Sequence, residues 1–241
     1  MKILALDTSS RYLCLGIVNG ERVFEYSMDT GLLLSRVLVP TIGRALAASG
    51  MSAGEVEYYA VGLGPGSFTA LRIGHAAVKA MAWARNRKVA GISTLEVIAS
   101  HPRLPEGLIV PLVDARRSML YCGWFSRESG RVRRFAADEL LGYDGFIRRL
   151  SEIQKTHRAK RVIITGDGLD ACAAMVKRSF PDAVIADKDL WYPRSGPLIS
   201  LALGRISEHK TVHPFKIGPV YLHPQECQIR DHRILRKQGK R

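Results

Sequence analysis

The sequence predicts an α/β protein made of two similar halves. The same order of elements occurs twice: three strands, a helix, a strand, a glycine-containing turn and a second helix. The two copies keep their spacing, since Asp7 and Asp114 each end a first strand (114 − 7 = 107) and Gly64 and Gly168 each lie in a glycine turn (168 − 64 = 104). We therefore expect an internal duplication that gives two lobes, each a small mixed sheet flanked by helices.

The first half, residues 1–104, begins with three apolar runs joined by a turn at Asn19-Gly20, which predict three antiparallel strands. A helical pattern follows, with Pro40 inside it, where a kink or a new turn is expected. A strand, the first glycine turn, a helix, a short strand and a helix from Thr94 complete this half. The expected strands are 3–7, 12–18, 22–26, 57–61 and 89–92, and the first helix is 32–48.

The second half, residues 105–224, follows a proline-containing linker at 101–105. Its expected strands are 108–113, 120–125, 131–135 and 162–165, and its expected helices are 144–157, 168–178 and 193–208. Residues 225–241 hold six basic and two acidic residues and few apolar ones, so we expect a disordered tail.

Composition points to a globular protein inside the cell. The chain has 241 residues, of which 46% are hydrophobic, so it can bury a sizeable core. Its four cysteines lack metal-type spacing and are expected to be reduced thiols. The apolar N-terminus reaches Asp7 too early for a signal peptide, and no membrane span is expected. We therefore expect a cytoplasmic protein that does not use a membrane.

The formal net charge of +14 is unevenly distributed. Residues 1–100 hold 10 Lys or Arg and 7 Asp or Glu, which leaves 26 and 15 for residues 101–241. A basic second half favours association with a polyanion, because counterions are released on binding. A merely basic surface without such a partner is the alternative.

The stretch 61–74, Val-Gly-Leu-Gly-Pro-Gly-Ser-Phe-Thr-Ala-Leu-Arg-Ile-Gly, predicts a strand, a tight turn and a helix. Such a turn either holds an anion at the helix N-terminus or is only a tight crossover. It is not a P-loop, because no lysine follows Gly66, and not a hydrolase elbow, because Thr69 stands where a glycine is needed. Ser67 is therefore predicted to be a helix cap and not a nucleophile.

Four motifs together resemble the bacterial TsaB (YeaZ) family over residues 1 to about 224. They are Asp7-Thr8-Ser9, Gly64-Pro65-Gly66-Ser67-Phe68-Thr69 with Leu71-Arg72-Ile73-Gly74, Asp114-Ala115-Arg116, and Pro219-Val220-Tyr221-Leu222. The glycine turn alone is also similar to the related, glycoprotease-like TsaD-type proteins. The resemblance implies the two-lobed actin/Hsp70-like fold (ASKHA, ribonuclease H-like). It also implies a role in making threonylcarbamoyladenosine in tRNA next to the anticodon, as the non-catalytic partner of a TsaD-type transferase and a TsaE-type ATPase.

The residues at the positions of the TsaD-type metal ligands argue against catalysis. Where that family carries His-x-x-x-His, this chain has Thr94 and Ile98, which cannot replace two imidazoles. The first phosphate turn lacks its usual glycine and reads Asp7-Thr8-Ser9-Ser10, so side chains would crowd a nucleotide. Two further departures, Ala70 for glycine and Leu34 for histidine, weaken a tight ligand site. We expect no catalytic residue, no metal and no required cofactor, with weak binding of ATP or ADP left open.

Three groups of candidate residues follow. A weak nucleotide or anion site would use Asp7, Thr8, Ser9, Gly64, Gly66, Ser67 and Asp114. Apolar residues of the helices from Leu32 and Leu71 are candidates for the contact with a TsaD-type protein: Leu33, Val37, Ile73, Ala77 and Met81; the alternative is that all five face their own sheet. The tail offers tRNA contacts at Arg230, Arg233, Arg236, Lys237, Lys240 and Arg241, or is only a solvated terminus.

Other polar residues have a structural interpretation beside the functional one. Asp7 and Asp114 either flank a metal-bound nucleotide or cap their turns, and Asp167 is expected to be a turn residue and not a base. His209 and His213 are interpreted as a chance pair at a helix end, because no glutamate accompanies them.

Three function classes remain from the sequence: a scaffold subunit of a tRNA-modifying complex, a small-molecule kinase-like ATPase of the same fold, and a peptidase. The first is favoured, because the missing glycine after Asp7 counts against the second class and the failed elbow against the third. The isolated chain could also form a homodimer, which the sequence leaves open.

Overall fold

The computed structural model describes residues 1–157 and 161–222. Its first sheet has the order β3-β2-β1-β4-β5, with β1, β2 and β3 antiparallel and β4 and β5 parallel to β1. The strands are β1 (Lys2–Asp7), β2 (Tyr12–Asn19), β3 (Arg22–Asp29), β4 (Tyr58–Gly62) and β5 (Lys88–Ile92). These match the expected positions, because alternating or continuous apolar runs flanked by glycine and asparagine turns specify strands locally.

The second sheet repeats this order as β10-β9-β6-β7-β8, and β6 takes the central place that β1 has in the first. Its strands are β6 (Gly107–Asp114), β7 (Met119–Glu128), β8 (Arg131–Gly142), β9 (Val162–Thr165) and β10 (Val184–Ile185). Strand β8 is longer than expected, and the two-residue β10 was not predicted. The repeated topology confirms the duplicated, two-lobed actin/Hsp70-like α/β fold.

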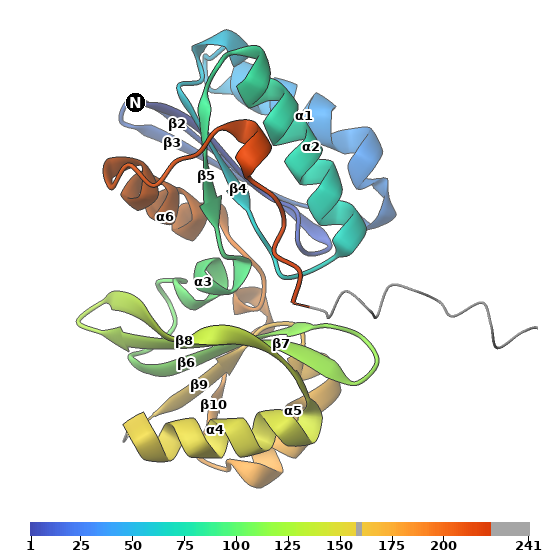
Figure 1. Ribbon diagram of the computed structural model, residues 1–241, viewed down its shortest axis with the longest axis vertical. Helices are drawn as coiled ribbons and strands as arrows, with labels where there is room; N and C mark the ends of the chain where they lie inside the picture. The colour runs from blue at the N-terminus through green and yellow to red at the C-terminus, as the bar shows by residue number, and fades with distance from the viewer. Residues whose placement is uncertain (158–160, 223–241) are drawn as a thin grey trace, which may run out of the picture.

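The helices cover both faces of each sheet (Figure 1). Helices α1 (Leu34–Ala48) and α2 (Phe68–Ala84) pack on one face of the first sheet, and α4 (Tyr143–His157) and α5 (Leu169–Ser179) on one face of the second. Pro40 lies inside α1 without ending it. Between the sheets lie α3 (Thr94–Ala99) and α6 (Ser195–Ser207), joined by an ion pair between Glu96 and Arg205 at 3.2 Å. The molecule thus stacks five layers, two of them sheets.

The domain boundaries expected from the sequence need a correction. Helix α6 lies within the segment assigned to the second lobe, yet Leu198, Ala202 and Ile206 pack against strands of the first sheet. The chain beyond α6 stays there: Val212 pairs with Val89 of β5, and Ile217 joins the first core. Residues 195–222 therefore belong to the first lobe. The sequence pattern shows that α6 is amphipathic but cannot say which of two similar sheets it covers.

The inner helices approach their sheets closely because a glycine lies beneath each of them. A Cβ at Gly16 of β2 would lie 2.5 Å from Ile199 Cδ1 of α6, and one at Gly123 of β7 would lie 3.1 Å from Leu95 Cβ of α3. The two glycines are 107 residues apart (123 − 16), the same offset that separates Asp7 from Asp114. The duplication therefore preserves the packing of the inner helices as well as the strand order.

One stretch, Gly31–Ala48, is long and apolar enough to cross a membrane by length and composition alone, with a mean hydropathy of 1.4. No membrane span was expected from the sequence. One face of its helix α1 packs in the first core through Leu34, Leu38, Ile42, Ala45 and Leu46. This packing accounts for part of its apolar character, while Leu32, Leu33 and Val39 are exposed.

The turn at Gly166 gives a test of the packing in the second lobe. Gly166 has a φ of +107°, and a Cβ there would lie 2.0 Å from the carbonyl oxygen of Leu112. We predict that Gly166→Ala lowers the free energy of unfolding by about 2 to 5 kcal/mol, from left-handed strain and the backbone clash together.

Gly130→Ala is the matched control, because Gly130 has a φ of +72° with nothing within 4 Å of its Cβ position. It should cost only the strain, about 1 to 2 kcal/mol. Urea denaturation of both variants measures the difference, and equal losses would contradict the clash.

Candidate functional site

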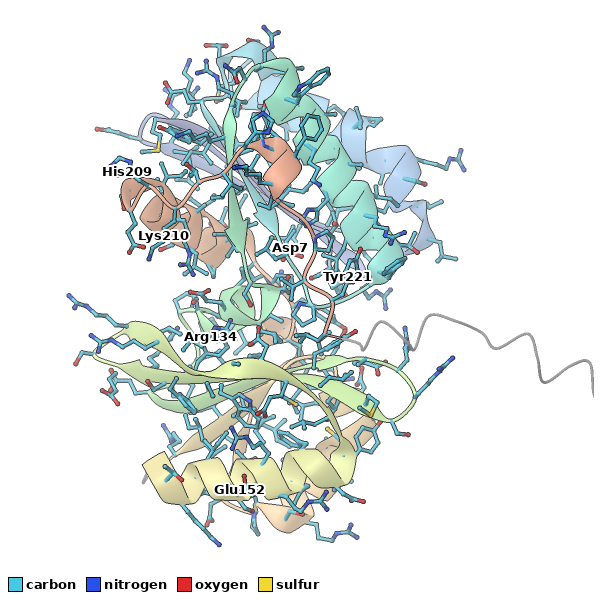
Figure 2. The ribbon with its side chains drawn as sticks, viewed as in Figure 1. Asp7, Arg134, Glu152, His209, Lys210 and Tyr221 are labelled. Atoms are coloured by element: carbon cyan, nitrogen blue, oxygen red, sulfur yellow. The ribbon has the colours of Figure 1, made fainter. Side chains whose placement is uncertain are left out.

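A cleft of about 470 Å³ lies between the lobes, where loops after the first strands of both halves meet. In such folds ligands bind at the carboxyl ends of strands, so this is the candidate site. Figure 2 shows Asp7 and Tyr221 at the side of the first lobe that faces the second. The lining residues are Ser9, Ser10, Arg11, Gly66, Ser67, Phe68, Leu71, Val113, Asp114, Ala115, Arg116, Tyr121, Asp167, Val220 and Tyr221.

Asp7 is buried beneath this cleft and does not line it. Its Oδ1 accepts a hydrogen bond from the Ser9 N–H at 2.8 Å, and its Oδ2 accepts one from the Thr94 hydroxyl at 2.6 Å. Burial raises the pKa of Asp7, and these hydrogen bonds oppose the rise. Asp7 therefore holds the first turn against helix α3.

The first turn and the glycine turn fill each other's space. A Cβ at Gly66 would lie 2.3 Å from the Ser9 carbonyl oxygen, and one at Gly74 would lie 2.3 Å from Thr8 Oγ1. The Ser67 N–H, at the start of α2, donates to the Ser9 carbonyl at 2.7 Å. A phosphate at this helix N-terminus would need the space that Ser9 fills, and it would need the Ser67 N–H as a donor. Both are already used by the protein. This geometry favours the interpretation of the glycine turn as a tight crossover.

The expected cap of helix α2 is confirmed. The Ser67 side chain accepts a hydrogen bond from the Ala70 N–H at 3.4 Å. The Thr8 hydroxyl donates to the Ala70 carbonyl at 2.8 Å and ties the same helical turn to the first strand. The carbonyl of Gly64 accepts from the Thr94 N–H at 2.9 Å, so this glycine is also used within the lobe.

Asp114 repeats the turn of Asp7 in the second lobe. Its Oδ1 accepts a hydrogen bond from the Arg116 N–H, two residues on, at 2.8 Å, as Asp7 accepts from Ser9. Its Oδ2 lies 3.1 Å from Arg116 Nη1. The Asp167 carboxylate accepts from the Asp114 N–H at 3.1 Å, and burial raises the pKa of Asp167. These contacts agree with turn capping by both strand-end aspartates and with a turn role for Asp167.

The structure separates the seven residues of the expected nucleotide or anion site. Ser9, Gly66, Ser67 and Asp114 line the cleft. Asp7, Thr8 and Gly64 are buried and do not line it. Asp7 and Asp114 therefore do not face each other across the cleft as the pair of carboxylates that would flank a metal-bound nucleotide.

The end of the described chain adds a wall to the cleft that was not predicted from the sequence. The guanidinium of Arg72 lies over the Phe68 ring at 3.7 Å, and its Nε donates to the Tyr221 hydroxyl at 3.2 Å. The rings of Phe68 and Tyr221 are 5.3 Å apart. Arg72 and Tyr221 are 149 residues apart, so only the Pro219–Leu222 motif indicated that this segment matters.

Within residues 1–157 and 161–222, no group of three or more His, Cys, Asp or Glu side chains could hold a metal ion. Ile98 is buried in helix α3. Of the two histidines considered as a pair, His213 caps a short helix by accepting from the Phe215 N–H at 3.3 Å. The cysteines of the described part, Cys14, Cys122 and Cys172, are buried and unpaired.

The five candidates for partner contact divide into two groups. Ile73, Ala77 and Met81 are partly buried and pack against the core of the first lobe. Leu33 is 53% exposed, and Val37 is half-buried. Leu32, in the short helix η1 (Gly31–Leu33) just before α1, and Val39 of α1 are also exposed and were not among the five candidates. The contact role stays a prediction, and its most exposed candidate, Leu33, lies directly before α1.

The six basic residues expected to touch tRNA lie at positions 230–241, outside the described residues.

Comparison with known proteins places the chain in a family. The family model described as "TsaD: tRNA N6-adenosine threonylcarbamoyltransferase" matches residues 33–194. The tRNA threonylcarbamoyladenosine biosynthesis protein TsaB of Bacillus subtilis is 30% identical over 153 residues, which cover 63% of this chain and 67% of that protein. The chain belongs to the TsaB (YeaZ) family. Escherichia coli TsaB is 25% identical over 225 residues, covering 92% of this chain and 94% of that one.

The fold comparison agrees with this membership. The solved structure of YeaZ from Pseudomonas aeruginosa matches with a TM-score of 0.76 at 24% identity, covering 92% of this chain and 99% of that one. The match covers both lobes, so the resemblance noted in the sequence motifs extends to the whole described architecture.

The buried carboxylate of Asp7 predicts a pH dependence of stability. Because the pKa of Asp7 is raised in the folded state, folding is favoured most when this carboxyl is protonated. Its contribution is complete below the unfolded pKa, near 3.8, and is lost as the pH rises through the raised value. We predict that Asp7→Asn gains stability relative to the wild type across this window. Urea denaturation between about pH 3 and pH 8 measures the difference.

Thr94→Val is the companion variant, since it removes one hydrogen bond to the buried carboxylate. It should lower the free energy of unfolding at neutral pH by about 1 to 3 kcal/mol. A pH-independent gap between wild type and Asp7→Asn would show that Asp7 is ionised without penalty.

Proposed function

We propose that this chain is a non-catalytic subunit of the machinery that makes threonylcarbamoyladenosine in tRNA. Its relatives are named for the biosynthesis of this nucleoside, which supports the pathway. The non-catalytic role is supported by the structural roles of Thr94 and Ile98. Where the resemblance implies histidine ligands in TsaD-type proteins, Thr94 donates to buried Asp7 and Ile98 is packed in the core. Neither position is available for a metal.

The partners in this proposal are a TsaD-type transferase, a TsaE-type ATPase and the tRNA that they modify. A tRNA substrate would place the reaction in the cytoplasm. The basic tail would add phosphate contacts within the complex.

No cofactor is required in this proposal. Ser9 fills the space under Gly66 of the glycine turn, and Thr8 fills the space beside Gly74 of α2. Room for ATP or ADP is found in the cleft that Arg116 lines. Weak nucleotide binding there agrees with this geometry. The packing disfavours the kinase-like ATPase, because its phosphate turn needs the space that Ser9 occupies. The capping role of Ser67 disfavours the peptidase.

The partner surface is proposed on helices α1 and α2. Exposed Leu32 and Leu33, directly before α1, and Val39 on α1 offer apolar area that would be removed from water on binding, at about 25 cal/mol per Å2 before association costs. Ala77 on α2 is only partly buried, so a large side chain there would project toward a partner.

Reconstitution tests the function. We predict that the purified chain alone gives no threonylcarbamoyl transfer, ATP hydrolysis or peptide cleavage above background. Addition of TsaD-type and TsaE-type proteins, tRNA, ATP and a threonylcarbamoyl donor should give modified tRNA, and omission of this chain should lower the yield at least ten-fold. Mass spectrometry of digested tRNA measures the product. Metal-dependent turnover by the chain alone would overturn the proposal.

The surface is tested by charge insertion. We predict that Leu33→Arg and Ala77→Arg each weaken binding to the TsaD-type protein at least ten-fold, because each buries an unpaired guanidinium. Val23→Arg is the control, since Val23 is 52% exposed on edge strand β3 and outside the proposed surface. Isothermal titration measures the affinities, and circular dichroism checks the fold. Unchanged affinity in both folded variants would move the contact elsewhere.

A further inference from the structure

A group of exposed rings lies at the C-terminal end of α2, outside the cleft. Trp83 is 61% exposed and Phe215, in the short helix η4 (Pro214–Lys216), is 65% exposed. Their ring centroids are 6.0 Å apart, and the His213 ring is 5.5 Å from that of Phe215. By contrast, Trp124 and Trp191 are buried. The proposed function uses none of these exposed rings.

Two distant chain segments form this surface. The backbone N–H of Val89 donates to the Val212 carbonyl and the reverse bond is also made, both at 2.9 Å. Figure 1 shows η4 lying beside α2. The Phe215 N–H is bonded to His213 Nδ1, which fixes the turn that carries the ring. The rings therefore stand on a preformed backbone and not on a loop that must fold to bind.

The two chain segments that carry the rings hold charges of one sign. Residues 79–88 and 209–218 hold six Lys or Arg and no Asp or Glu: Lys79, Arg85, Arg87, Lys88, Lys210 and Lys216. Among the described residues only Lys210 of these has an ion pair, with Glu208 at 2.7 Å. Two carboxylates that precede β4 are engaged elsewhere, Glu55 with the Lys2 ammonium and Glu57 with the Lys2 backbone N–H. We call these rings and cations the aromatic–cationic patch.

The combination selects one class of partner. Exposed rings alone would fit an apolar protein face. Such a face would, however, remove water from the five cations without an ion pair and offer them no counter-charge, which costs binding free energy. A single-stranded nucleic acid supplies both complements, since its bases stack on aromatic rings and its phosphates pair with Lys and Arg. The chain's net charge of +14 adds long-range attraction for the same partner.

We propose that the aromatic–cationic patch binds single-stranded RNA, with bases stacked on Trp83 and Phe215 and phosphates neutralised by Arg85 and Arg87. Base stacking on rings tolerates any sequence, so the site has little sequence preference. Binding needs no partner protein and no modification reaction. It goes beyond the scaffold role and does not depend on it.

Tryptophan fluorescence gives a local readout, because Trp83 is the exposed one of the three tryptophans. The full chain is titrated with an unstructured RNA of about twelve alternating A and C nucleotides. We expect quenching of the exposed emission on binding. In Trp83→Phe the quenching should vanish, while fluorescence anisotropy of labelled RNA shows affinity within about two-fold, because phenylalanine still stacks.

Ring and charge removal give the affinity test. Each of Trp83→Ala and Phe215→Ala should weaken RNA binding about five-fold or more. Arg85→Gln with Arg87→Gln should lower the slope of log affinity against log salt by about 0.7 per lost phosphate contact. The matched control is Arg131→Gln with Arg133→Gln on β8, two exposed arginines away from the patch, whose loss should leave the Trp83 quenching in place.

Truncation after Pro224 separates the patch from the basic tail. In the truncated chain, RNA should still quench Trp83, and Phe215→Ala should still weaken RNA binding. Two results would overturn the proposal. In the first, RNA binds without quenching Trp83, and neither Trp83→Ala nor Phe215→Ala changes the affinity; the RNA would then bind another surface. The other is unchanged RNA affinity together with lost self-association or lost TsaD-type binding in the ring variants, which would make the patch a protein interface. Neither result depends on whether the reconstituted complex modifies tRNA.

Discussion

The first lobe is organised around the carboxylate of Asp7, which is buried at the carboxyl end of the central strand. It joins three pieces of chain: its own turn through the Ser9 N–H, helix α3 through the Thr94 hydroxyl, and β4, where Gly62 leaves room for it. A Cβ at Gly62 would lie 2.1 Å from Asp7 Oδ2. Because a buried carboxylate is costly without donors, the residues around it are constrained in identity as well as in volume. The same contacts close the space in which a nucleotide's phosphates would lie.

The two halves show how a duplicated turn can take two environments. Asp7 and Asp114 make the same hydrogen bond to the backbone two residues on, at 2.8 Å in each case. Around Asp7 the glycine turn and α3 exclude water. Around Asp114 the turn stays at the cleft, and an exposed arginine supplies the second contact. This aspartate–backbone hydrogen bond is common to both halves, whereas the burial of the aspartate differs between them.

Local patterns in the sequence were sufficient for most elements. The strand at 58–62 and the helix after Ser67 follow from a β-forming run, three glycines and a helical apolar period, and the structure places both there. The long-range choices were not accessible in the same way. Helix α6 has an apolar face that would suit either sheet, and its long-range packing, including Ile199 over Gly16, decides between them. Likewise, the apolar stripe of α2 is wide enough that Ile73 and Met81 could face a partner or their own core, and the structure puts them partly in the core. The contact of Arg72 with Tyr221 joins residues too far apart for any local pattern to indicate.

Helix α6 comes late in the sequence but covers the first sheet, and this affects the order of folding during synthesis. Strand β1 is made first, but the helix that covers one face of its sheet, residues 195–207, is made last among the helices longer than one turn in the described chain. Until then Ile3, Ala5 and Ala60 lack their contacts with α6 on that face, although α1 and α2 already cover the other. A ribosome adds about 5 to 20 residues per second, so this apolar face waits for several seconds or longer between the synthesis of β5 and that of α6. The first lobe therefore cannot complete its core until the strands and helices of the second have been synthesised.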